Sequence, residues 1–224
     1  MALRSVFGRL PRRGWIAVVA GAGAAALVAA WFLGLGRPAP ERAPRYVEVA
    51  HGAYVLPKPD AIAAFDLVRH DETKFDNAAL KGRWSFLIFG YTSCPDFCPT
   101  TLATFQVLHE RLAKTAEGTR EVQFVMVSVD PERDTAKLLA AYVTHFNPAF
   151  VGVTGSVAQV ARLADSVGAE YQKQPPAAEG HYVVDHSTSV LLVNPEGQVR
   201  GVFAPPHEAT DLFDGFLKIR ASAP

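Results

Sequence analysis

The chain is 224 residues long, with 49% hydrophobic and 20% charged residues, which is typical of a globular protein and excludes a disordered or fibrous one. Its 22 basic and 22 acidic residues cancel, but seven of the arginines and only one acid lie within residues 1–45. The remainder therefore carries 15 basic against 21 acidic residues. Because phosphate binding requires a basic surface, this acidic remainder argues against nucleic acid as a partner.

An apolar segment near the N-terminus predicts a membrane anchor. Residues 14–36 read GWIAVVAGAGAAALVAAWFLGLG and contain no charged side chain. As a helix, these ~23 residues would reach roughly 34 Å, enough to cross a hydrocarbon core of about 30 Å. The apolar region of a cleaved signal peptide is shorter, about 7 to 15 residues, so the length favours an uncleaved transmembrane helix over 15–36. The arginines that precede it predict a cytoplasmic N-terminus over 1–14, with the rest of the chain outside the cytoplasm.

A proline-rich stretch follows the anchor and separates it from the main body of the chain. Its prolines lie at positions 38, 40, 44, 57 and 59, which predicts a semi-extended linker over 37–60. We expect a single domain over 61–224. A domain of about 165 residues buries about 70% of its unfolded surface, so it needs no disulfide to be stable.

Apolar runs in this domain predict buried strands, and apolar residues at helical spacing predict helices between them. The predicted strands are 84–91, 121–129, 149–155, 187–193 and 198–203, the last two joined by the turn sequence NPEG. The predicted helices direct these residues to the core: Leu102, Phe105, Leu108 and Leu112 in the first; Leu138, Tyr142 and Phe146 in the second, which runs from Thr135 to Phe146; and Val157, Val160, Leu163 and Val167 in the third, which ends at Gly168. A last helix is expected over 208–219. This order predicts an α/β domain with a central mixed sheet flanked by helices, the thioredoxin-like fold.

The only two cysteines, Cys94 and Cys98, lie between the first buried strand and the helix after it, in the sequence YTSCPDFCPTTL. Ligand sites in such sheets lie beyond the carboxyl ends of the strands. A helical spacing of four separates the two Cα atoms by ~6 Å, which suits both a disulfide and a shared metal ion. A loop this short removes little entropy from the unfolded chain, so a purely structural disulfide is disfavoured. We therefore expect a functional dithiol that is redox-active, metal-binding, or both.

A metal ion held by two thiolates needs a further ligand, and two sulfurs with an imidazole favour Cu(I) or Zn(II). Two of the seven histidines, His181 and His186, flank the sequence YVVD just before the predicted strand 187–193. A loop at this place can face the cysteines, and spacing alone does not choose between the two. Four other histidines fall in predicted helices, the linker or an early turn, and we expect ordinary surface or packing roles for them: His51, His70, His109 and His145.

Five stretches of the domain, in this order, resemble the Sco (SenC/PrrC-type) family: IAAFDLV, YTSCPDFCPTTL, VMVSVDPERDT, VGVTGS and YVVDHSTSVLLVNPEG. Members of that family are thioredoxin-like copper chaperones of cytochrome c oxidase assembly in bacteria and mitochondria. The resemblance implies that copper is bound by Cys94 and Cys98 of the C-x-x-x-C-P motif and by His186 of the D-H-S/T motif. It leaves His181 without that role.

The resemblance also implies a place and partners for the protein. We expect a single-pass protein of the bacterial inner membrane whose periplasmic domain delivers copper to the binuclear centre in the copper-binding subunit of cytochrome c oxidase. Because thiolates must be reduced to bind metal, a thiol reductant of the periplasm is a second expected partner. The same residues also fit a thiol-disulfide oxidoreductase that reduces the copper-ligand cysteines of the oxidase, or a copper or redox sensor.

The sequence SVDPERDT, residues 128–135, contains two further acids of interest. Asp134 or Thr135 is expected to cap the helix that follows. Asp130 ends the second buried strand at the sheet edge where the cysteines lie. We therefore expect it to accept a hydrogen bond from His186 or to approach the metal in its outer coordination sphere, the alternative being a turn acid that bonds local backbone N–H groups.

Overall fold

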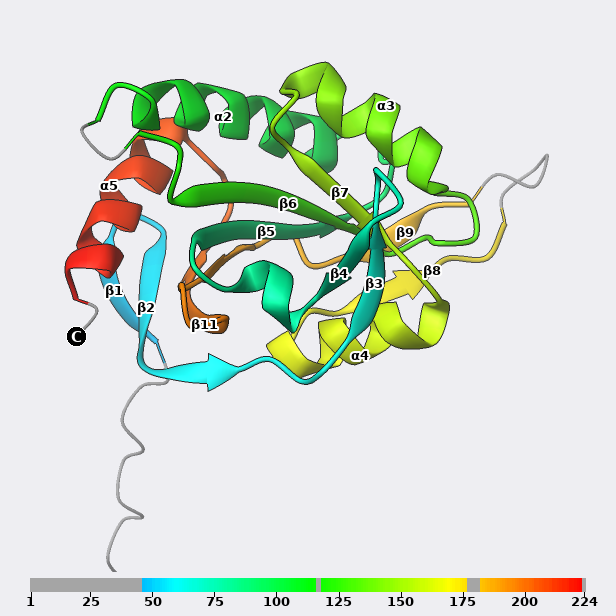
Figure 1. Cartoon of the computed structure of the whole chain (residues 1–224), viewed down its shortest axis with the longest axis horizontal. Helices are drawn as coiled ribbons and strands as arrows, with labels where there is room; N and C mark the ends of the chain where they lie inside the picture. Colours follow the sequence, from blue (N-terminus) through cyan, green and yellow to red (C-terminus); the bar gives the residue numbers. More distant parts are fainter. Residues whose placement is uncertain (1–45, 116–117, 177–181, 223–224) are drawn as a thin grey trace, which may run out of the picture. The chain divides into compact units, whose positions relative to one another are not determined.

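The computed structural model describes residues 46–115, 118–176 and 182–222 (Figure 1). The predicted cytoplasmic N-terminus and transmembrane helix lie outside these ranges. Within them, every helix is too short or too polar to cross a bilayer.

A nine-stranded mixed sheet forms the centre of the domain, in the order β1-β2-β11-β10-β5-β6-β7-β3-β4. Its three parallel neighbours are β5 (Trp84–Gly90), β6 (Val122–Ser128) and β7 (Val151–Thr154). The other strands pair antiparallel: β1 (Val47–Ala50), β2 (Ala53–Ala61), β3 (Asp66–Arg69), β4 (Lys74–Asp76), β10 (Val190–Val193) and β11 (Gln198–Phe203). A separate two-stranded ribbon joins β8 (Tyr171–Lys173) to β9 (Val184–His186).

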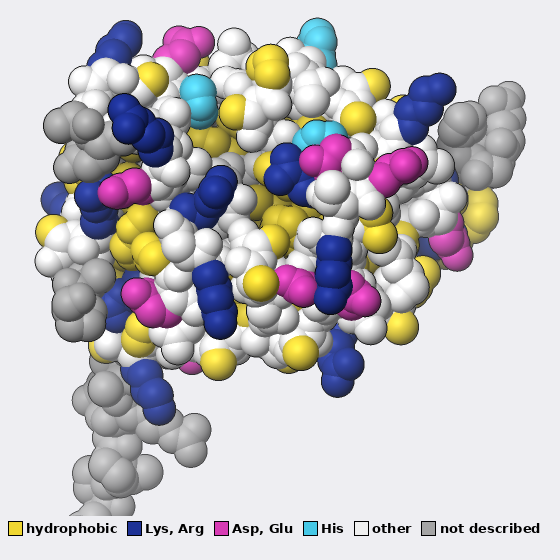
Figure 2. Space-filling model, viewed as in Figure 1, with side chains coloured by type: hydrophobic (Ala, Val, Ile, Leu, Met, Phe, Trp, Pro, Cys, Tyr) yellow, Lys and Arg dark blue, Asp and Glu magenta, His cyan; other side chains and the backbone are white. Residues whose placement is uncertain are grey.

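Helices cover both faces of the sheet, as predicted (Figure 1). Phe86 and Ile88 of β5 belong to the core shared with α2 (Phe97–Leu112), α3 (Ala136–Phe146) and α5 (Ala209–Ala221). Leu87 and Phe89 point to the opposite core, which contains α4 (Val157–Val167) and the short 3-10 helix η1 (Asn77–Leu80). Alternate side chains of a buried strand thus serve two cores. The surface seen in Figure 2 mixes Lys and Arg with Asp and Glu.

Phe86 lies at the centre of an aromatic cluster that fixes α2 and α5 on the sheet. Its ring stacks on Phe124 at 5.3 Å and on Phe203 at 5.8 Å. It also meets the edge of Phe105 in α2 at 6.0 Å and tilts against Phe216 in α5 at 5.4 Å. Such pairs add about 0.5 to 1.5 kcal/mol each beyond the burial of their area. The cluster therefore holds α2 against β5, and the cysteines lie where β5 leads into this helix.

The part of the predicted linker over 37–60 that the structure describes belongs to the sheet, so that prediction is wrong there. β1 pairs with β2, β2 pairs with β11, and Ala53 and Val55 are buried in the core. The domain begins by Val47, well before the predicted boundary at Ala61. The prolines of this segment favoured a linker in the sequence. Its short alternation of apolar and polar residues is nevertheless sufficient for a strand once a partner strand lies beside it.

Pro57 and Pro59 are compatible with β2 because the pairing with β11 is irregular beside them. The register of the two strands shifts between Val199 and Gly201. At such an irregularity a missing backbone N–H does not remove a regular ladder bond. The buried side chain of Arg200 completes the region by donating from Nη1 to the Pro57 carbonyl at 3.2 Å.

The core-facing side of α3 differs by one residue from the prediction. Leu138 is 44% exposed, whereas Leu139 and Val143 are fully buried. The reason lies in β7, because a Cβ on Gly152 would lie 3.0 Å from Leu139 Cβ and 3.3 Å from Val143 Cγ1. The missing side chain allows these two residues to approach the strand. Thr135 caps the helix by accepting from the Leu138 N–H at 3.2 Å.

The other predicted helix faces are largely as expected. Tyr142 and Phe146 are half-buried and pack against the core below α2 and α5. In α4, Val160 is buried but Val157, one turn earlier, is 53% exposed, so its predicted core role is wrong. Gly168 ends the helix in the left-handed conformation, at φ 69°, as predicted from its position.

The predicted strand over 187–193 begins later, at Val190, and a separate strand, β9, precedes it. Ser187 causes the break, because it bonds to Glu170, the residue before β8, instead of the main sheet. Its N–H donates to the Glu170 carbonyl at 2.8 Å, and its Oγ accepts from the Glu170 N–H at 2.8 Å. The chain therefore leaves the ribbon at His186 and enters the main sheet only three residues after Ser187.

Adjacent substitutions in α3 test its orientation. Leu139→Ala should lower the free energy of unfolding by about 2 to 5 kcal/mol, because it leaves a cavity against β7. Leu138→Ala should change it by less than about 0.5 kcal/mol, since its side chain faces solvent. Urea denaturation of the two variants measures this difference, and equal losses would contradict the observed face.

Candidate metal centre

The two cysteines and one histidine converge at the carboxyl end of β5. Cys94 lies in the loop after β5, Cys98 lies in the first turn of α2, and His186 ends β9. Their ligand atoms all lie within 4.8 Å of one another. His186 Nε2 is 3.8 Å from Cys94 Sγ and 3.6 Å from Cys98 Sγ. Both thiols are free.

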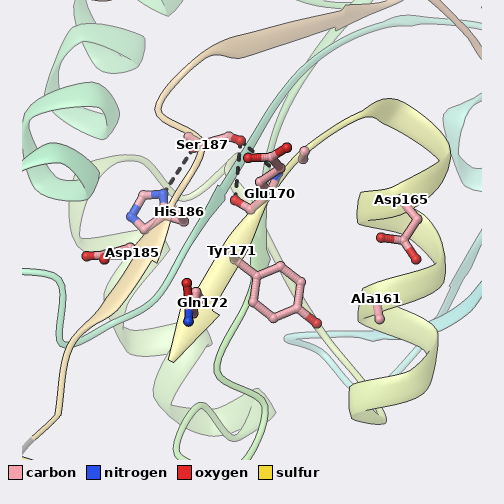
Figure 3. Close-up of a pocket in the computed structure, with 9 residues that line it drawn as sticks. Ala161, Asp165, Glu170, Tyr171, Gln172, Asp185, His186 and Ser187 are labelled. Carbon is pink, nitrogen blue, oxygen red and sulfur yellow. Dashed lines mark hydrogen bonds between the residues drawn. The ribbon is translucent and has the colours of Figure 1, made fainter. Parts of the chain in front are cut away.

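The imidazole of His186 is oriented by contacts on its other atoms. Its Nδ1–H donates to the carbonyl of Ser187 at 3.0 Å (Figure 3). The ring of Tyr91 meets it edge-on, with centroids 5.8 Å apart and planes at 89°. Because a carbonyl can only accept, Nδ1 carries the proton and Nε2 is the nitrogen available for a metal.

The spacing of the ligand atoms fits a single metal ion. With bonds of about 2.3 Å to sulfur and about 2.0 Å to nitrogen, as for zinc, a trigonal centre separates nitrogen from sulfur by about 3.7 Å. The observed separations of 3.8 and 3.6 Å lie on either side of this value. Two thiolates and one imidazole form a soft donor set that suits Cu(I) or Zn(II). The arrangement can therefore hold one soft metal ion with little movement of its ligands.

Gly90, the last residue of β5, provides the space that the Cys98 sulfur occupies. A Cβ at this position would lie 2.6 Å from Cys98 Sγ and 3.3 Å from Met126 Cε. Cys98 is only 2% exposed, whereas Cys94 is 9% exposed. Cys94 and His186 also line an open hollow of about 320 Å³ with Phe97 and Val183, both exposed. The centre is thus open to solvent on the side of Cys94.

The two thiols share one negative charge. A hydrogen bond from the Cys98 thiol is the main cause that lowers the pKa of Cys94 to about 3, and bonds from His186 and the Asp96 N–H contribute to it. The hydrogen bond to Cys94, together with burial, raises the pKa of Cys98 well above its ordinary range. The site thus holds a thiolate on Cys94 and a proton on Cys98. A metal that binds both sulfurs must displace that proton.

His186 stabilises the thiolate in return. Burial is the largest influence on its pKa and lowers it, but the hydrogen bonds to Cys94 and to the Ser187 carbonyl outweigh burial and raise it overall. The imidazole and the Cys94 thiolate therefore stabilise each other through this hydrogen bond. Metal binding replaces the hydrogen bond by bonds from both atoms to one cation.

Asp134 has a role at the site that the sequence did not indicate. We expected Asp134 or Thr135 to cap α3, and the structure shows that Thr135 is the cap. Asp134 is therefore free for another role. Its carboxylate, 1% exposed, accepts from the N–H of Thr92 at 3.0 Å, from the Thr92 hydroxyl at 2.6 Å and from the Ser128 hydroxyl at 2.6 Å. It thereby ties the cysteine loop to the end of β6. The only sequence signal for this role was that Asp134 follows β6, at the sheet edge where the cysteines lie.

Asp130 does not accept a hydrogen bond from His186, so this part of the prediction is wrong. Its buried carboxylate accepts from the hydroxyl of Tyr182 at 2.8 Å and pairs with the guanidinium of Arg133. The reason is local, since the turn that begins at Asp130 brings Arg133, three residues later, against it. The Asp130 carboxylate thus binds Tyr182, which lies four residues before His186.

His70 and His109 take part in local hydrogen bonds, as expected for packing residues. His70 Nδ1 accepts from the Gly152 N–H at 3.0 Å, and His109 Nδ1 accepts from the Asn147 side chain at 3.3 Å. His181 lies outside the described residues. The sequence could not choose between His181 and His186 by spacing, and the structure brings His186 to the cysteines.

The fold and the site define a thioredoxin-like protein with a dithiol-histidine metal centre. The sequence profile of the SCO1/SenC family matches residues 55–219. The chain therefore belongs to the SCO1/SenC family.

Several known proteins are similar to this chain. A putative copper-binding protein of Stutzerimonas stutzeri is 39% identical over 154 residues, which cover 68% of this chain and 73% of that protein. The mitochondrial SCO2 homolog of Homo sapiens is 36% identical over 159 residues, which cover 70% of this chain and 59% of that protein. The chain thus matches about three fifths of the length of the human relative.

Two solved structures with copper bound share the fold. Arabidopsis thaliana ScoI superposes with a TM-score of 0.67 and 32% identity, covering 72% of this chain and 99% of that chain. Yeast Sco1 superposes with a TM-score of 0.68 and 26% identity, covering 74% of this chain and 91% of that chain. Copper, the predicted metal, is the ion bound in both of these proteins.

The low pKa of Cys94 predicts an unusual dependence of its alkylation on pH. Only the thiolate is nucleophilic. At a pH below its pKa of about 8.5, an ordinary thiol therefore reacts about tenfold faster for each unit by which the pH is raised. Since the Cys94 pKa is about 3, its thiolate is already complete above pH 5. Iodoacetamide should therefore label Cys94 at a nearly constant rate from pH 5 to 8, measured by mass spectrometry of the reduced protein.

Cys98→Ala is the control for this measurement. It removes the hydrogen bond that contributes most to the low pKa, so the constant range should begin at a higher pH. A labelling rate in the unchanged protein that rises tenfold per unit up to pH 8 would contradict the assignment.

Proposed function

We propose that this protein is a copper chaperone that binds one copper ion through Cys94, Cys98 and His186. The observation that carries the proposal is the convergence of these three ligand atoms within 4.8 Å, from segments far apart in the sequence. Two thiolates and an imidazole suit Cu(I). Membership of the SCO1/SenC family and the likeness to copper-bound Sco structures support copper as the ion.

Delivery to the binuclear copper centre of cytochrome c oxidase is the proposed task. A chaperone must release its ion as well as bind it, and a three-coordinate centre leaves room for an incoming ligand. Cys94 and His186 line the open hollow, whereas Cys98 is almost fully buried. An acceptor thiolate of the oxidase subunit would therefore displace Cys94 and His186 first and Cys98 last.

The proposed location is the bacterial inner membrane, with a single N-terminal transmembrane helix over 15–36 and the domain in the periplasm. The support is the uncharged segment and the arginines before it. In an oxidising compartment the two thiols are exposed to disulfide formation, and a disulfide offers no thiolate to a metal. The proposal therefore includes a periplasmic thiol reductant as a partner.

A thiol-disulfide oxidoreductase is the second candidate function, and the state of Cys94 favours it. A thiolate with a pKa of about 3, next to a protonated second thiol, is the arrangement of an attacking and a resolving cysteine. Such a protein would reduce the copper-ligand cysteines of the oxidase before metallation. Both functions use the same sulfurs, so cysteine substitutions do not separate them.

His186→Ala separates the two functions. A copper centre of two sulfurs and one nitrogen loses a third of its protein ligands, so we expect copper affinity to fall by more than about 100-fold. The dithiol should still cycle, because thiol exchange requires only the two sulfurs. Copper affinity, disulfide reduction and oxidase metallation in cells are measured on the same variant. Tight copper binding by His186→Ala would contradict the ligand assignment.

His181→Ala is the matched control, since it removes the other imidazole of the same loop region and should leave all three measurements unchanged. If His186→Ala loses copper but the oxidase is still metallated, the reductase function replaces the chaperone. If both copper and metallation are lost, the chaperone is supported.

Protease accessibility tests the proposed topology. In spheroplasts, protease added from outside should digest the domain, because it lies on the periplasmic side of the membrane. The full-length chain should also remain in the membrane after a carbonate wash, since a transmembrane helix is not released by high pH. A soluble periplasmic form without its first ~35 residues would contradict the anchor argument.

A further inference from the structure

His186 is held differently from the two cysteines. Cys94 and Cys98 follow β5, a strand buried along its whole length in the main sheet. His186 ends β9, which has three residues and pairs only with β8 among the described strands. An isolated two-stranded ribbon is at best marginally stable in water. The position of the third ligand therefore depends on contacts outside its own strand pair.

On its C-terminal side, His186 is held by backbone bonds. Ser187 bonds to Glu170, and the chain enters β10 of the main sheet at Val190. These contacts lie within four residues of His186. They fix one end of the segment that carries the imidazole, and the other end needs its own support.

On the N-terminal side, Arg133 holds Tyr182, four residues before His186. Its Nη1 donates to the Tyr182 carbonyl at 3.1 Å. Its guanidinium lies 3.6 Å from the centroid of the Tyr182 ring and 5.6 Å from that of Tyr91. Tyr91 in turn meets the edge of the His186 ring. Arg133 thus contacts both the chain that leads to His186 and the ring that packs against it.

Asp130 holds the guanidinium of Arg133 in place. Its carboxylate, 3% exposed, pairs with the Arg133 guanidinium and accepts from the Tyr182 hydroxyl at 2.8 Å. The same turn carries Asp134, which holds the cysteine loop at Thr92. One short loop between β6 and α3 therefore contacts both halves of the metal centre. A planar guanidinium suits this role because it bonds and stacks at the same time.

We infer that Arg133 is a positioning residue of the copper centre, which sets the distance between His186 and the two sulfurs by clamping Tyr182 to the loop after β6. The inference rests on the proposed function, in which His186 is a copper ligand. Without the clamp, the ribbon must be ordered when the metal binds, and that ordering lowers affinity. Outer contacts of metal ligands typically change affinity about 10- to 100-fold.

A double-mutant cycle tests whether Arg133 acts through His186. Copper affinity of the reduced full-length chain in detergent is measured by Cu(I) competition with a chelator. Arg133→Met should weaken binding about 10- to 100-fold in the unchanged protein and less than about twofold in the His186→Ala background. Equal effects in the two backgrounds, or wild-type affinity of Arg133→Met, would overturn the inference.

Two further variants make the result specific. Arg111→Met is the matched control, because Arg111 also lies over a ring, that of Phe213 at 5.3 Å, and bonds Thr210 at 2.6 Å, away from the centre. It should leave copper affinity unchanged. If Arg133→Met does not fold, Tyr182→Leu replaces it, because it removes the ring under the guanidinium. Its effect on copper affinity should also be non-additive with that of His186→Ala. Additive effects of these two substitutions would overturn the inference. If His186→Ala alone leaves copper affinity unchanged, the proposed function itself fails.

Discussion

Two sulfur atoms and one imidazole nitrogen meet in this protein although the histidine lies 88 residues after the second cysteine. The charge that they share is largely buried, and a buried thiolate is stable only where hydrogen bonds replace its water. Here the Cys98 thiol, the His186 side chain and the backbone N–H of Asp96 supply them. The rest of the site follows from this requirement, since every element around it serves to bring these donors to one sulfur.

The main sheet satisfies half of this requirement. Parallel β5 and β6 end at the same edge, so the cysteine loop and the loop after β6 are neighbours. Gly90 leaves room for the Cys98 sulfur, and Asp134 ties Thr92 of the cysteine loop to Ser128. The aromatic cluster around Phe86 holds α2, which carries Cys98, against the sheet. A sulfur ligand that is already in place lowers the cost of binding a metal ion.

The histidine half is built from smaller parts. His186 belongs to a short ribbon between α4 and the loop after β6, beside the groove of about 770 Å³ that Asp165, Glu170 and Asp185 line (Figure 3). Its place is set by the bonds of Ser187 to Glu170 on one side and by the contacts of Arg133 with Tyr182 on the other. The sulfur pair follows a strand that is buried along its whole length, whereas the imidazole depends on the proposed clamp of Arg133. This asymmetry supports the proposed transfer of a metal ion.

The sequence by itself determined the mixed sheet, the helices on its two faces and the identity of the dithiol, because hydrophobic periodicity and the spacing of cysteines are local signals. The family resemblance named His186. Only the tertiary structure showed that residues 47–60 join the sheet, since a proline-rich strand is recognisable only once β11 lies beside it. It also decided the partners of Asp130 and Asp134. A carboxylate bonds whichever donor the fold places near it, and a linear sequence does not contain that distance.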